Sequence, residues 1–133
     1  MTAPAILLVL LAAGLCAGCG AADRAPDAAA VAERFHAALD GRDGAAACAE
    51  LSEETAVKLA QQEHRPCQQA ILDLELPTGD AVVHTSVYVT SASVSLLHGY
   101  ALFLDEAADG WEISAAGCRP TAPDMPYDCE LEG

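Results

Sequence analysis

The sequence predicts an α+β fold in which N-terminal helices pack on a curved, mainly antiparallel sheet of four to five strands, preceded by a signal peptide. Three observations support this: residues 1–22 carry no charge, residues 27–74 have apolar side chains at helical spacing, and residues 81–116 alternate like strands. The chain has 133 residues, enough for one core. We expect a signal peptide at 1–18, a flexible tether at 19–26 and a single domain at 27–133.

The leader contains an apolar run at residues 5–15, which has the length of a signal-peptide core and is short for a membrane span. Ala17 and Gly18 directly precede Cys19, and this sequence resembles the lipobox of bacterial lipoproteins. The resemblance implies that Cys19 is acylated and begins a mature chain held on the outer face of the cytoplasmic membrane. Simple secretion and an uncleaved membrane helix are the alternatives, and all three place the domain outside the cytoplasm.

Four cysteines lie beyond the leader, at positions 48, 67, 118 and 129. An even set in an exported protein predicts disulfides, with three possible connectivities. We favour the sequential pairing, Cys48 with Cys67 and Cys118 with Cys129, because each pair lies within one local stretch of chain. A zinc site is the alternative, but structural zinc usually takes its ligands in close pairs, which these spacings do not provide. We therefore expect no metal and no cofactor.

The first helix of the domain is expected to begin at Asp27, whose carboxylate can cap it. Val31, Phe35 and Leu39 recur every fourth position and give an apolar stripe. Gly41 stands where a left-handed C-terminal cap is expected. The stripe predicts that this helix covers the sheet.

Three shorter helices are expected next. The first spans residues 45–51, the second begins after Ser52 as its cap and ends at the His-Arg-Pro sequence of residues 64–66, and the third spans residues 67–74. The Cys48–Cys67 bridge would then connect short helices to each other.

Beyond Asp80 the pattern changes to that of strands. Val, Thr and Tyr alternate over residues 81–90, and further strands are expected at 93–97, 100–105 and 111–116. Residues 106–110 end in Asp-Gly, which is typical of a hairpin loop. The tail, residues 119–133, is expected to be held at the sheet edge by the Cys118–Cys129 bridge.

The first helix with its Leu-Asp-Gly-Arg-Asp turn at residues 39–43, Cys48, Cys67, and the strand from Gly110-Trp111 to Cys118 give residues 27–129 a likeness to a family. This region resembles small actinobacterial lipoproteins of the nuclear-transport-factor-like, or cystatin-like, cone fold. The resemblance implies a shape and a location more than an activity.

Charge narrows the choice of partners. The chain has 20 Asp and Glu against 6 Lys and Arg, a net charge of -14, which argues against nucleic acid because phosphate binding depends on cationic side chains. We expect contact with the membrane through the lipid, and with an envelope protein or a small ligand through the domain. The predicted function is a non-catalytic binding or interaction module at the cell surface.

The alternative is a small enzyme, because the cone fold also hosts polyketide-cyclase-like and ketosteroid-isomerase-like activities. Such chemistry needs a shielded carboxylate base and a donor aimed at the developing oxyanion. The candidates are Asp105, His98 and Tyr100, and further polar groups on the strands are His84 and Tyr88. Asp105 borders the hairpin loop and His98 precedes a glycine at a strand break, so we expect both to be solvated and assign no catalytic residue.

Overall fold

The computed structural model describes residues 21–133, so the predicted signal peptide and Cys19 lie outside the described residues. Helices come first and strands follow, which confirms the predicted α+β fold. The helices are α1 (Ala21–Asp40), α2 (Gly44–Ala49), α3 (Glu53–Glu63) and α4 (Cys67–Asp73). The strands are β1 (Val82–Tyr88), β2 (Ser91–Leu96), β3 (Ala101–Ala107), β4 (Gly110–Pro120) and β5 (Tyr127–Glu132).

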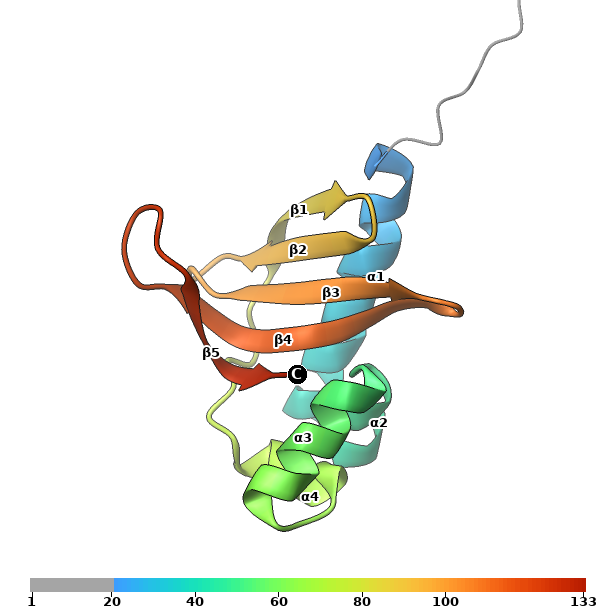
Figure 1. Ribbon diagram of the computed structural model, residues 1–133, viewed down its shortest axis with the longest axis vertical. Helices are drawn as coiled ribbons and strands as arrows, with labels where there is room; N and C mark the ends of the chain where they lie inside the picture. The colour runs from blue at the N-terminus through green and yellow to red at the C-terminus, as the bar shows by residue number, and fades with distance from the viewer. Residues whose placement is uncertain (1–20) are drawn as a thin grey trace, which may run out of the picture.

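The five strands form one antiparallel sheet in the order β1-β2-β3-β4-β5. Helix α1 lies across one face of this sheet, and α2, α3 and α4 gather beyond the edge formed by β4 and β5 (Figure 1). The core lies between α1 and the sheet, where Phe35 meets Val94, Leu102, Leu104 and Ile113, all at most 1% exposed. We call α1 with the five strands the sheet layer, and residues 44–73 the helical lobe.

Helix α1 begins earlier than predicted. It starts at Ala21 and includes Pro26, so the expected flexible tether is wrong for residues 21–26, and Asp27 lies inside the helix instead of capping it. Pro26 removes one helical hydrogen bond. Contacts with the sheet compensate, because the Arg24 guanidinium donates to Glu106 Oε2 at 2.9 Å and to the carbonyl oxygen of Val89.

The helix ends are partly as predicted. The Ser52 side chain accepts from the N–H of Thr55 and caps α3, and α3 ends at His64 in the left-handed conformation, as the His-Arg-Pro sequence indicated. The left-handed cap after α1 was assigned to the wrong residue. Arg42, at φ 53°, takes this conformation in place of Gly41. The left-handed residue lets the N–H of Asp43, which caps α2, donate back to the Ala38 carbonyl oxygen of α1 at 2.8 Å.

The tail contains a strand that sequence periodicity did not identify. Strand β4 runs on to Pro120, and β5 pairs with it through Cys118 opposite Cys129 and Ala116 opposite Leu131. Leu131 is buried in the core. The tail is therefore the fifth strand of the sheet.

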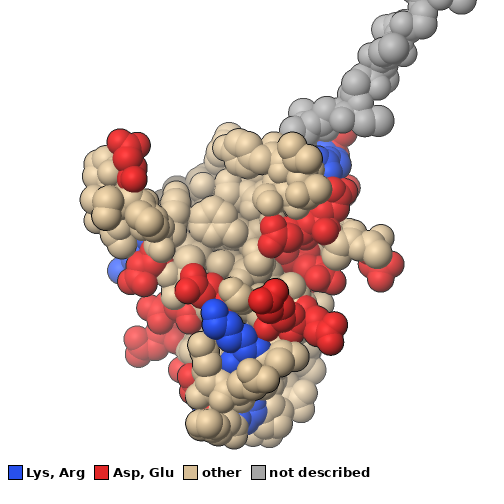
Figure 2. All heavy atoms as spheres, viewed as in Figure 1, with Lys and Arg blue, Asp and Glu red and all other residues tan. Residues whose placement is uncertain are grey.

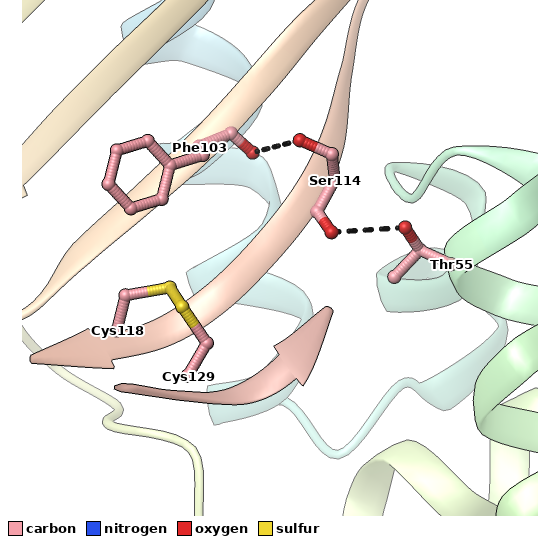
Figure 3. Close-up of a disulfide and its surroundings, with 5 residues drawn as sticks. All are labelled: Thr55, Phe103, Ser114, Cys118 and Cys129. Atoms are coloured by element: carbon pink, nitrogen blue, oxygen red, sulfur yellow. Dashed lines mark hydrogen bonds between the residues drawn. A yellow bond between two sulfur atoms is a disulfide. The ribbon is translucent and has the colours of Figure 1, made fainter. Parts of the chain in front are cut away.

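The helical lobe joins the sheet layer through apolar packing, through the ion pair of Arg34 on α1 with Glu50 at 2.8 Å, and through hydrogen bonds to β4. The N–H of Ser52 donates to the Ile113 carbonyl oxygen, and the N–H of Ile113 donates to the Glu50 carbonyl oxygen, both at 2.9 Å. The Thr55 hydroxyl donates to the Ser114 carbonyl oxygen at 3.1 Å (Figure 3). These bonds attach the lobe to the middle of β4.

Candidate functional site: the open face of the sheet

The sheet has a second face, turned away from α1, which we call the open face. Its residues follow from the strand register: Ser91, Ser93 and Ser95 alternate with the buried side chains of β2 and so point away from the core. Ser93 pairs with Ser86 on one side and Phe103 on the other. Figure 1 shows this face toward the viewer, with α1 behind the sheet.

A hollow of about 290 Å³ lies on the open face. Ser93 and Phe103, which pair across β2 and β3, contribute to its lining. The exposed Tyr88 on β1 and Tyr127 on β5 line it from the two outer strands of the sheet. The rings of Phe103 and Tyr127 meet edge to face with centroids 5.0 Å apart. Its lining is uncharged throughout: Tyr88, Ser91, Ala92, Ser93, Ser95, Ala101, Phe103 and Tyr127.

Charged groups surround this hollow instead of lining it. Figure 2 shows the centre of the face in tan, with Asp and Glu gathered around it. On one side Asp105 accepts a hydrogen bond from the Ser91 hydroxyl at 3.0 Å. On another, the Arg119 guanidinium carbon lies 4.2 Å from the centre of the Tyr100 ring. The surroundings of the hollow are mainly acidic in this view (Figure 2).

The Cys118–Cys129 disulfide flanks the open face. Cys118 pairs with Ala101 and Cys129, so the bridge joins residues that lie directly opposite each other on β4 and β5 (Figure 3). The second disulfide joins Cys48 to Cys67 in the helical lobe, with 6.2 Å between the Cα atoms. Both pairs match the sequential connectivity expected from the sequence.

The residues of the enzyme alternative lie at different ends of the sheet. His98 and Tyr100 lie at the β2–β3 turn, whereas Asp105 lies five positions along β3 from Tyr100, a distance of about 16 Å in an extended strand. His84 Nε2 lies 2.9 Å from the Ser86 hydroxyl on β1. The structure does not bring Asp105 together with either proposed donor.

His98 instead forms a pair with Asp80. Its Nδ1 lies 2.8 Å from Asp80 Oδ1, and its backbone N–H donates to Oδ2 at 3.2 Å. The Asp80 side chain is 3% exposed while that of His98 is 73% exposed. Burial alone would raise the pKa of Asp80, but hydrogen bonds from His98 and Ala81 and the charge of His98 lower it below its ordinary value. The pair fixes the β2–β3 turn to the start of β1.

His36 on α1 is a buried polar residue that was not among the residues predicted for the site, and it is 6% exposed. Its Nδ1 has no hydrogen-bond partner among residues 21–133. Burial lowers the pKa of this imidazole, and the carboxylates of Asp40 and Asp80 oppose the shift in part. The sequence does contain a pattern that indicates its burial, because Ala28, Ala32 and His36 recur every fourth position beside the predicted apolar stripe.

Two further properties of residues 21–133 bear on the site. Within this range, no group of three or more His, Cys, Asp or Glu side chains is arranged to hold a metal ion. No helix in the same range is long and apolar enough to cross a membrane.

Comparison with protein-family models, curated proteins and solved structures found no match to this chain. The likeness to the cone fold stays a prediction.

Proposed function

We propose that the protein is exported, anchored by lipid at Cys19 on the outer face of the cytoplasmic membrane, and acts as a non-catalytic binding module through its open face. One observation carries the binding role: among residues 21–133, no helix covers the second face of the five-stranded sheet, and an uncharged, aromatic hollow lies on this face. The two disulfides support export, because such bonds persist in oxidising compartments.

The chemistry of the hollow selects a class of partner. The rings of Phe103 and Tyr127 offer apolar contact, and the serine hydroxyls donate and accept hydrogen bonds. The acidic surroundings repel anions and favour neutral or basic groups. At about 290 Å³, the hollow is at the lower limit for small-molecule sites. The proposed partner is therefore a segment of an envelope protein that inserts one or two apolar or basic side chains.

In-cell photo-crosslinking tests the binding role. A benzophenone amino acid at Ser93, in the lining of the hollow, should give a discrete protein adduct in cells that express the full chain. Tyr127→Ser removes an exposed ring of the hollow and should reduce the adduct at least about fivefold, a loss of about 1 kcal/mol of binding. Val57→Ser is the matched control, because Val57 is 47% exposed and Tyr127 46%, but Val57 lies on α3.

Two outcomes would contradict this role. Equal adducts from the probe at Ser93 and at the exposed Gln61 of α3 would show that the open face is not preferred. An adduct that persists in Tyr127→Ser would show that the aromatic hollow does not contribute.

The anchor has a separate test. Cys19→Ser should leave the precursor unprocessed and remove the acyl mass from the intact protein, whereas Cys16→Ser, three residues away, should leave both unchanged. Unchanged processing and membrane retention in Cys19→Ser would overturn the anchor. Mass spectrometry of the purified chain reports its N-terminus, acyl mass and disulfide state together.

A further inference from the structure

The β1–β2 turn exposes apolar side chains that folding does not require. Tyr88 is 66% exposed and Val89 is 83% exposed, the most exposed of the large apolar residues described. Val89 also has φ 47°, a left-handed conformation that branched side chains rarely adopt and that Asn or Gly adopts readily. A side chain that faces solvent in a strained conformation stabilises nothing inside the domain.

This turn lies beside the start of α1. The Arg24 guanidinium donates to the Val89 carbonyl oxygen, and its ion pair with Glu106 holds the same helical turn against the end of β3. Figure 1 shows β1 ending next to the first turns of α1. The β2–β3 turn and the β4–β5 loop lie at the opposite end of the sheet, because consecutive strands are antiparallel.

The position of α1 limits the distance between this turn and the anchor. Helix α1 begins at Ala21, two residues after Cys19, and two residues span at most about 7 Å. A lipid on Cys19 would place the start of α1, and the turn that Arg24 ties to it, at the bilayer surface.

We propose that Tyr88 and Val89 form a membrane-contacting tip that rests in the interfacial region of the bilayer; this inference rests on the proposed anchor at Cys19. Tyrosine suits this depth because its ring is apolar and its hydroxyl is polar. Arg24, a cation in the first turns of α1, is paired with Glu106. The tip therefore contacts a neutral lipid surface by apolar burial and not by attraction to anionic headgroups.

Photolabelling in vesicles tests the tip. The full chain, purified from membranes with its lipid, is reconstituted in phosphatidylcholine vesicles that contain a phospholipid with a diazirine near the glycerol end of its acyl chain. Labelling mapped by mass spectrometry should be at least about fivefold higher on residues 85–92 than on segments around Leu97 or Met125. These control residues are also exposed, at 63% and 57%, but lie at the opposite end of the sheet.

The Val89→Asn variant separates lipid contact from folding. Asn suits the left-handed conformation, so the turn should be as stable as before or more so, while labelling of the tip falls at least about threefold. Leu97→Asn, which alters the turn at the opposite end, should leave the labelling of the tip unchanged.

Each outcome decides between the two proposals. An intact mass without acyl groups overturns both the anchor and the tip. An acylated protein whose residues 85–92 are labelled no more than the Leu97 segment, or equally in wild type and Val89→Asn, overturns the tip and leaves the anchor intact.

Discussion

The sheet layer and the helical lobe each contain one disulfide, but they pack in different ways. Large apolar side chains fill the space between α1 and the sheet. In the lobe, α2 meets α4 through small residues, with Gly44, Ala47 and Ala70 all buried. The lobe also adds Leu51, Leu59 and Ile71 to the apolar core. The α2–α4 contact itself buries little apolar area, so close backbone approach and a covalent bond hold these two helices together. The bridge of the lobe therefore holds two helices against each other, whereas the bridge of the sheet layer holds one edge strand.

The largest expected effect comes from breaking the bridge of the lobe. Replacing Cys48 and Cys67 by Ser should lower the free energy of unfolding by about 3 kcal/mol, because the bridge closes a long loop. Hydrogen exchange should show lost protection throughout residues 44–73, with α1 and β2–β4 retained.

The matched variant, with Ser at Cys118 and Cys129, should lose protection only near β5. Pairing with β4 and burial of the Leu131 side chain still hold β5 in place. If both double variants lose hydrogen-exchange protection over equally long segments, the two regions do not differ in how they use their disulfides.

The next effect comes from Gly44. A Cβ atom added there would lie 1.9 Å from the carbonyl oxygen of Gln68 on α4, so the helices would have to move apart. Gly44→Ala should destabilise by about 2 kcal/mol by overpacking. Gly41→Ala is the control, because its Cβ would have its nearest contact at 3.4 Å and should change stability by less than about 0.5 kcal/mol. Urea unfolding measures both, and similar losses would show that the close approach is unimportant.

A smaller effect is expected where the two regions join. The Thr55 side chain is fully buried, donates to Ser114 and lies 2.7 Å from the Ser52 hydroxyl. Thr55→Val removes this donor, although the Ser114 carbonyl oxygen still accepts from the N–H of Gly133 at 2.9 Å, and should cost about 1 kcal/mol. Thr78→Val, at an exposed loop position, should cost almost nothing. A neutral Thr55→Val in thermal unfolding would mean that apolar packing and the backbone hydrogen bonds hold the lobe to β4 without this hydroxyl.

Sequence patterns were sufficient to predict those parts of the fold that depend on neighbouring residues in the chain. Apolar residues at helical spacing located the covered face of α1, Ser52 located the cap of α3, and the alternation over residues 81–90 located β1. The even cysteine count and local spacing predicted both bridges.

Features set by distant contacts were missed. Helix α1 continues through Pro26 because Arg24 contacts Val89 and Glu106, which are 65 and 82 positions away in the sequence. The short tail has no long apolar run, and it becomes β5 through pairing with β4. The hollow on the open face also required the strand register, because it gathers residues from β1, β2, β3 and β5.

The smallest expected effect concerns His36, which belongs to the sheet layer but carries a polar atom into its packed face. Burial lowers the pKa of the folded imidazole below the unfolded value of 6.5, so the unfolded chain binds a proton that the folded chain excludes. Stability should therefore fall as the pH drops below about 6.5. His36→Leu should be neutral or stabilising by up to about 1 kcal/mol at neutral pH, because an unpaired buried nitrogen is removed. Urea unfolding across this pH range should show a shallower decline in His36→Leu than in wild type. If His36→Leu declines as steeply as wild type, protonation of other groups controls the acid sensitivity of the sheet layer.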